Sequence, residues 1–133
     1  MSLFNKMFRN SEPNKVTNEN AVQWYDLTEL NQLDTIAAES AQTPVFIFKH
    51  STRCGISRMV LKNFESHYNL ADNEIKGYFL DLLSHRDISN EIARRFDVVH
   101  QSPQLILIKD GKCHYTASHS DIDADELKEK IRL

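Results

Sequence analysis

The chain has 133 residues, with 16 basic and 19 acidic side chains and a formal net charge of −3 at pH 7. This length is sufficient for one domain with a substantial core, and the charge balance excludes the strongly basic surface typical of general nucleic-acid-binding proteins. Because no apolar run suits a signal peptide or a membrane span, we expect a cytoplasmic protein that binds no nucleic acid and has no stable membrane association.

The first part of the chain predicts a tail, two strands and a helix. Residues 1–20 end in the polar stretch NSEPNKVTNEN, which predicts a flexible tail and leaves residues 21–133 as the domain. The alternating stretch VQWYDL (22–27) predicts a strand, and Thr28 is suited to cap a helix that ends at Ser40. One face of that helix would carry the apolar residues Leu30, Leu33, Ile36 and Ala37. The run VFIFK (45–49) is typical of a strand buried on both faces.

The second part predicts three helices and three strands. A helix is expected from about Ile56 to Tyr68, a strand over KGYFLDL (76–82) and a helix over 88–96 that starts within 84–87. The apolar positions of the first of these helices are Met59, Val60, Phe64 and Tyr68. The pair Asp110-Gly111 between QLILIK (104–109) and a strand over 112–117 predicts a hairpin, and a last helix is expected over 123–132.

The order of these elements predicts the fold. Strands alternate with helices, and the chain closes with a hairpin and a helix. This order is typical of an α/β domain with a thioredoxin-like fold, in which a central mixed sheet of four to five strands is flanked by helices. The strand over 45–49 would then be central and would deliver Cys54 to the start of a helix.

The two cysteines, Cys54 and Cys113, do not suggest a structural disulfide, because the cytoplasm keeps thiols reduced. The six histidines have no cysteine or histidine partners at the short spacings of a zinc site, so no metal site is predicted. A lone cysteine in such a protein is usually a small buried side chain. We interpret Cys113 in this way and expect it to share a packed face with Tyr115 and Ala117.

Cys54 differs from Cys113 because of its place in the chain. At the first turn of a helix, unpaired N–H groups and the positive end of the helix dipole favour an anion, and Arg53 adds a full charge next to it. We therefore expect Cys54 to hold a larger thiolate fraction than a free cysteine and to act as a nucleophile. Ser57 stands where a redox enzyme usually has its second thiol, and its hydroxyl could donate a hydrogen bond to the thiolate.

Three stretches carry a resemblance to a known family. FKHSTRCGIS (48–57), SPQLILIKDGK (102–112) and ASHSDI (117–122), in this order and at these distances, resemble the YtxJ-type monothiol bacilliredoxins. The resemblance implies an oxidoreductase that removes bacillithiol from mixed disulfides on S-thiolated client proteins. It implies no resident cofactor, because the low-molecular-weight thiol is a co-substrate. We expect the protein to be a monomer.

The same fold and resemblance suggest where substrates bind. Pro103 precedes the fourth strand, where this topology is expected to have a cis peptide bond that turns the backbone of Ser102 toward an extended substrate. Pro103 could also simply terminate a loop. Ser118 and His119 lie before the last helix, where related proteins bind the small thiol, although His119 could be a solvated loop histidine.

One departure from the family leaves two alternatives open. Gly55 follows Cys54, whereas the family commonly has proline there, and the resulting Cys-Gly-Ile-Ser is similar to monothiol glutaredoxins that carry iron–sulfur clusters. The stretches ASHSDI and SPQ lack the paired glycines and the Thr-Val-Pro of those carriers. The other alternative is a thioredoxin-fold interaction module in which the cysteine has no chemical role.

Overall fold

The computed structural model describes residues 22–132 and shows a five-stranded mixed sheet with the strand order β1-β3-β2-β4-β5. The predicted tail over residues 1–20 lies outside the described residues. The strands are β1 (Trp24–Asp26), β2 (Val45–His50), β3 (Lys76–Asp81), β4 (Gln104–Lys109) and β5 (Lys112–Ser118). The first three strands are parallel, and β4 runs antiparallel to both β2 and β5. This architecture confirms the predicted central mixed sheet.

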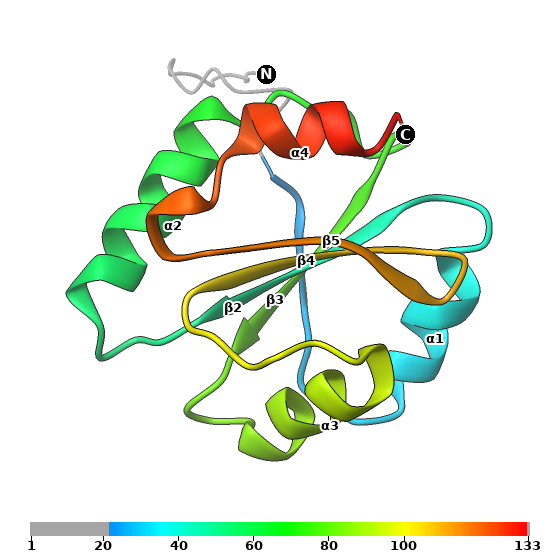
Figure 1. Ribbon diagram of the computed structural model, residues 1–133, viewed down its shortest axis with the longest axis horizontal. Coiled ribbons are helices and arrows are strands. Elements are labelled where there is room, and N and C mark those ends of the chain that lie inside the picture. Colours follow the sequence, from blue (N-terminus) through cyan, green and yellow to red (C-terminus); the bar gives the residue numbers. More distant parts are fainter. Residues whose placement is uncertain (1–21, 133) are drawn as a thin grey trace, which may run out of the picture.

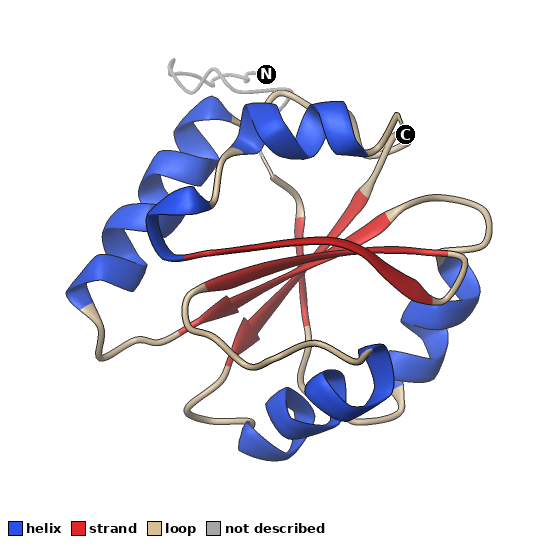
Figure 2. Cartoon of the chain, in the orientation of Figure 1, coloured by secondary structure: helices blue, strands red, loops and turns tan. Residues whose placement is uncertain are grey.

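Helices cover both faces of the sheet (Figures 1 and 2). The helices are α1 (Gln32–Glu39), α2 (Gly55–His67), α3 (Arg86–Phe96) and α4 (Ala124–Lys130), with a short 3-10 helix η2 (His119–Asp121). The helices α2 and α4 lie on one side of the strands, and α1 and α3 lie on the other (Figure 1). No helix within residues 22–132 is long and apolar enough to cross a membrane.

Each face of the sheet has its own hydrophobic core. Val45 and Ile47 of β2 pack with residues of α1 and α3, whereas Phe46 and Phe48 pack with residues of α2 and α4. Trp24 joins the second core, where its ring centroid lies 5.6 Å from that of Phe46. Because successive side chains of a strand point to opposite faces, Lys49 belongs to the α1/α3 face and His50 to the α2/α4 face.

The sheet has two ends, which differ in the strands that begin and finish there. The Cys54 end is where β2 and β3 finish, β4 begins and β5 finishes. The far end is where β2 and β3 begin and where Asp110 and Gly111 join β4 to β5. Both turn residues have positive φ, 53° and 74°, which is the two-residue hairpin geometry that Asp-Gly predicts.

Glycine has a packing role at one point in the sheet. Gly77 on β3 lies opposite Phe46 on β2. A Cβ atom at position 77 would overlap the Phe46 ring. The absence of a side chain at this position therefore leaves room for the Phe46 ring against the neighbouring strand.

The prediction that Thr28 caps the first helix is wrong. The helix begins at Gln32, because the Gln32 side chain accepts hydrogen bonds from the backbone N–H groups of Thr28 (2.7 Å) and Glu29 (2.9 Å) and holds a separate turn before it. Leu30 lies in this turn and is exposed rather than part of the apolar face. Met59 was likewise expected on the apolar face of α2, but it is 73% exposed.

The prediction that Cys113, Tyr115 and Ala117 share one packed face is also wrong. The register of β5 against β4 shifts between Leu107 and Ile108, which pair with Tyr115 and Cys113. One extra residue in β5 at this bulge reverses the alternation of side chains. Cys113 consequently packs on the α1/α3 core, while Tyr115 and Ala117 pack on the α2/α4 core.

Candidate active site

Cys54 occupies the N-cap position of α2, directly after the turn that follows β2. Its N–H donates to the carbonyl of Ser51 (3.2 Å), and its carbonyl accepts the first helical hydrogen bond from Arg58 N–H (3.2 Å). Cys54 is partly exposed. The side chain is therefore accessible to another molecule, while its backbone is held at both sides.

Ser57 lies in the first turn of α2 and is fully buried. Its hydroxyl oxygen accepts a hydrogen bond from Ser51 N–H (3.1 Å) and lies 2.8 Å from Nδ1 of His50. Within residues 22–132 no hydrogen bond joins Ser57 to Cys54, so donation to the thiolate stays a prediction. In this structure Ser57 connects the end of β2 to the start of α2.

His50, the partner of Ser57, is buried at the end of β2. Burial lowers the pKa of its imidazole, the negative charge of Asp81 opposes this shift, and the positive charge of Arg58 adds to it. The imidazole is therefore held in its neutral form at neutral pH. Which ring nitrogen carries the hydrogen depends on the tautomer, and the bond to Ser57 is consistent with either direction of donation.

Two arginines flank the cysteine turn. Arg53, which the sequence predicts as a stabiliser of the thiolate, is exposed and forms no hydrogen bond or ion pair with any residue that the structure describes. Arg58, which sequence reasoning missed, donates from Nη1 to the carbonyl of Thr52 (3.3 Å) and so braces the same turn.

The sheet brings Ser102 and Pro103 to the Cys54 end. Lys49 of β2 pairs with Gln104 of β4, so Pro103 lies next to the end of β2, and the Ser102-Pro103 peptide bond is cis, as predicted. The carbonyl of Pro103 accepts a hydrogen bond from His119 N–H (3.0 Å). The hydroxyl oxygen of Ser102 is buried and has no hydrogen-bond partner among the described residues.

Ser118 and His119 lie beside this segment. Ser118 pairs with Gln104, and η2, which begins at His119, contacts α2. His119 is exposed and has a positive φ of 55°. The last helix begins only at Ala124, and its N-cap Asp123 accepts a hydrogen bond from Asp125 N–H (2.9 Å). A carboxylate of the chain therefore already occupies the start of α4, the helix before which we expected the small thiol to bind.

Cys113 lies at the far end, because it pairs with Ile108, which in turn pairs with Val45 at the start of β2. Burial raises the pKa of its thiol, an effect that a hydrogen bond to the Tyr115 carbonyl (3.8 Å) partly opposes. The protonated thiol is a weak nucleophile. Within residues 22–132, no group of three or more His, Cys, Asp or Glu side chains could hold a metal ion.

Three polar residues at the Cys54 end were not predicted as site residues. Lys49 is fully buried, Gln104 is 2% exposed, and His100 contacts Lys49. From the sequence, no site is assigned to Lys49 or to His50, which end the central strand. The burial of Lys49 and His50 could have been predicted, because they directly follow the unbroken apolar run of a strand that is buried on both faces. Nothing in the sequence marks Gln104 or His100.

Comparisons with known proteins agree with this geometry. The family described as "Monothiol bacilliredoxin BrxC" matches residues 25–127. A solved structure with a thioredoxin fold has a TM-score of 0.69 and 29% identity, over 80% of this chain and 92% of that chain.

Two thioredoxins have a similar structure. Thioredoxin Mala s 13 from Malassezia sympodialis has a TM-score of 0.66 and 17% identity over 87% of this chain and 93% of that chain. Thioredoxin f from spinach chloroplast has a TM-score of 0.61 and 13% identity, over 87% of this chain and 96% of that chain. At these low sequence identities, the two thioredoxins support the fold of this chain and nothing further. The chain thus has the thioredoxin-like fold predicted from its sequence, and with the match over residues 25–127 it belongs to the monothiol bacilliredoxin family of thiol oxidoreductases.

Proposed function

We propose that this protein removes a low-molecular-weight thiol, bacillithiol or a similar compound, from mixed disulfides on client proteins through Cys54. The observation that carries the proposal is the environment of this residue. Cys54 is a partly exposed cysteine at the N-cap of a 13-residue helix, and position 57, one turn later, is a buried serine. The cysteine can accept a thiol from a client, but no neighbouring thiol can displace that thiol.

The reaction follows from thiol–disulfide exchange. The Cys54 thiolate attacks the sulfur of the small thiol in the mixed disulfide, so that a new disulfide forms on Cys54 and the client leaves as a thiolate. A second small thiol, as its thiolate, then attacks the adduct. This step releases the small thiol as its own disulfide and regenerates the Cys54 thiolate. Electrons come from the small thiols, so the reaction needs no resident cofactor.

The other site residues have supporting roles in this proposal. Arg53 and Ser57 stabilise the thiolate, one by its charge and the other by a hydrogen bond. The backbone at Ser102 and Pro103 pairs with the client, and Ser118 and His119 contact the small thiol. The protein acts as a monomer in the cytoplasm.

The test is a single-turnover experiment with a client protein that carries bacillithiol on one cysteine. Mass spectrometry should show the adduct mass leaving the client and appearing on Cys54. In the variant Ser57→Cys the adduct should be lost and replaced by an internal disulfide, because cysteines at these two positions in one helical turn lie within bridging reach. An unmodified Cys54 after complete mixing, or the absorption of an iron–sulfur cluster in protein purified without oxygen, would contradict the proposal.

A further inference from the structure

Lys49 is a fully buried lysine in the central strand of the sheet. It lies on the same face of β2 as Val45 and Ile47, both of which belong to the hydrophobic core under α1 and α3. Within residues 22–132 no carboxylate lies within 4.0 Å of its ammonium group. Burial lowers the pKa of Lys49 to about 8, so the group is still mainly charged at neutral pH. A buried charge without an acidic partner opposes folding, which indicates a role other than stability.

The contact that Lys49 makes is with His100. Its Nζ lies 2.5 Å from Nδ1 of the His100 ring, and the hydroxyl of Ser89 on α3 lies 3.4 Å from the same nitrogen. A lysine ammonium can only donate hydrogen bonds, so Nδ1 must be the acceptor and the ring hydrogen must be on Nε2. The buried lysine therefore selects one tautomer of a histidine that is itself exposed.

Burial and two nearby positive charges keep the His100 ring neutral. Burial lowers its pKa most, and the positive charges of Lys49 on β2 and Arg86 at the start of α3 lower it further. The two ring nitrogens are separated by one carbon atom, and their hydrogen-bonding directions diverge. Because Nδ1 is occupied by the buried Lys49 and the residue is exposed, Nε2–H is the ring donor left for a ligand.

The segment that carries His100 is held in place at the Cys54 end. The Gln104 side chain donates from Nε2 to the carbonyl of Val99 (2.9 Å), and its Oε1 accepts a hydrogen bond from Gln101 N–H (3.3 Å). These two bonds fix the residues on either side of His100. The next residue along is Ser102, whose hydroxyl oxygen is buried and has no partner among the described residues.

We propose that His100 binds the mixed-disulfide substrate by donating from Nε2–H to an acceptor oxygen beside the disulfide, and that Lys49 is the positioning residue that fixes its tautomer. The inference rests on the proposed function, because it names a recognition element for that reaction. The acceptor is a carboxylate of the small thiol or a carbonyl of the client chain. Both are oxygen acceptors, and the experiment distinguishes them.

The first measurement does not depend on activity. The ring nitrogens of His100 in 15N-labelled protein should have the NMR shifts of an imidazole with its hydrogen on Nε2 throughout the neutral pH range. In Lys49→Met this preference should weaken and the titration of His100 should move to higher pH. A hydrogen on Nδ1 in the wild type, or an unchanged tautomer in Lys49→Met, would overturn the role of Lys49.

The second measurement is the KM for the thiolated client. His100→Leu and Lys49→Met should raise KM by about tenfold, the effect of one hydrogen bond, whereas His100→Gln, which keeps an N–H donor at a similar distance, should stay near the wild type. Lys76→Met at the far end is the matched control and should leave KM unchanged. An unchanged KM in His100→Leu would overturn the proposal.

Stability separates positioning from a structural role. Lys49→Met should raise the midpoint of thermal unfolding while it weakens substrate binding, because it removes the buried charge. A lower midpoint together with a loss of rate in every assay would assign Lys49 to the structure alone and would overturn the proposal.

Two adducts on the same client identify the acceptor. If the variants affect a client that carries bacillithiol, which has carboxylates, but not one that carries cysteamine, which has none, the acceptor is on the small thiol. Equal effects on both place it on the client chain. If the wild-type protein removes neither adduct, the proposed function is wrong, and so is the proposal that His100 binds the substrate. The NMR measurement still decides independently whether Lys49 sets the His100 tautomer.

Discussion

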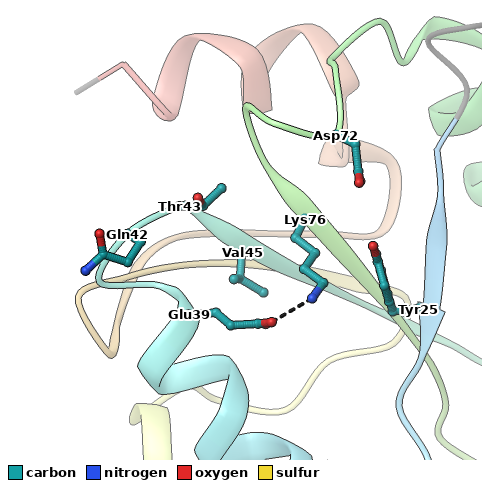
Figure 3. A pocket seen from close by; sticks show the side chains of 7 residues that line it. All are labelled: Tyr25, Glu39, Gln42, Thr43, Val45, Asp72 and Lys76. Atoms are coloured by element: carbon teal, nitrogen blue, oxygen red, sulfur yellow. Dashed lines mark hydrogen bonds and ion pairs between the residues drawn. The ribbon is translucent and has the colours of Figure 1, made fainter.

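Lys49 and Lys76 lie at opposite ends of the sheet and have opposite electrostatic environments. Lys76, at the start of β3, donates to Glu39 Oε2 (2.6 Å), and its ammonium lies 4.3 Å from the centroid of the Tyr25 ring. The hydrogen bond to Glu39 raises the pKa of Lys76, whereas burial without an acid lowers that of Lys49 to about 8. Figure 3 shows the Lys76–Glu39 pair among the side chains that line a pocket of about 320 Å³. Among the described residues, Lys76 at the far end thus has an acidic partner, and the buried Lys49 at the Cys54 end has none.

The same contrast extends to the other polar groups. At the far end, Ser40 and Glu39 join α1 to the hairpin and to β3. At the Cys54 end, the buried polar side chains His50, Ser57 and Gln104 hold the turn before α2 and the segment before β4. The far end should therefore contribute to stability without affecting exchange, while the Cys54 end should affect both. Four experiments test this division.

The two cysteines should give the largest difference. Cys54→Ser should abolish removal of the small thiol from a client, because no other thiol lies in that turn. Cys113→Ser, which changes a protonated thiol at the far end, should leave the rate within a few fold. Mass spectrometry of the client over time measures both. Equal damage from the two substitutions would require Cys113 to act as a resolving thiol.

Two buried serines form a matched pair for the next largest effect. Ser57→Ala leaves the Ser51 N–H group without its acceptor, and Ser40→Ala does the same to the Gly111 N–H group at the far end (2.7 Å in the present structure). Each substitution should lower the free energy of unfolding by about 1–3 kcal/mol. Only Ser57→Ala should also slow exchange, by about tenfold. Urea unfolding and exchange rates measure the two effects, and an equal slowing by Ser40→Ala would remove the distinction between the two ends.

Glu39→Gln should have a smaller effect that is confined to the far end. It removes the negative charge that pairs with Lys76, and it weakens the hydrogen bond from the Tyr78 hydroxyl (2.8 Å). Because the ion pair is partly solvated, we expect a loss of about 1 kcal/mol in the free energy of unfolding and no change in exchange rate. Burial and the bond to Glu39 raise the pKa of Tyr78 to about 12, and the tyrosine absorbance of the variant should titrate at lower pH. A slower exchange rate would show that the two ends are coupled.

The smallest effect concerns pH. Burial lowers the pKa values of both His50 and His100 below the ordinary value of 6.5. The unfolded chain therefore binds more protons than the folded chain just below pH 6.5, so stability should fall as the pH falls through this range. His50→Gln and His100→Gln should each make the free energy of unfolding less dependent on pH between neutrality and pH 5. If neither variant changes the slope, the two histidines are not the groups responsible.

The sequence was most informative where periodic patterns and turn residues act locally. The apolar runs over β2 and β4, the Asp110-Gly111 hairpin and the cysteine at the start of α2 all predicted the observed elements. The predictions failed where a side chain altered the local pattern. Gln32 delays the start of α1 by holding a turn of its own, and the bulge in β5 moves Cys113 to the opposite face from Tyr115.

The site was only partly predictable for a different reason. Cys54, Ser57 and Pro103 belong to short motifs that can be recognised along the chain. The contact between Lys49 and His100 depends on the fold, because the position of β4 beside β2 brings together two residues that are far apart in the sequence. A polar residue within an apolar strand predicts that a polar partner exists, but it does not indicate which loop supplies that partner.

Trp24 gives the protein an optical signal of its own. It is the single tryptophan of the chain, and its indole N–H donates to Glu65 Oε2 (2.8 Å) on α2 while its ring packs against Phe64 of the same helix. Fluorescence of this protein excited at the tryptophan band therefore comes from one ring in contact with the helix that begins at Cys54. Displacement or unfolding of that helix will change the emission directly, so the variants above can be compared without a label.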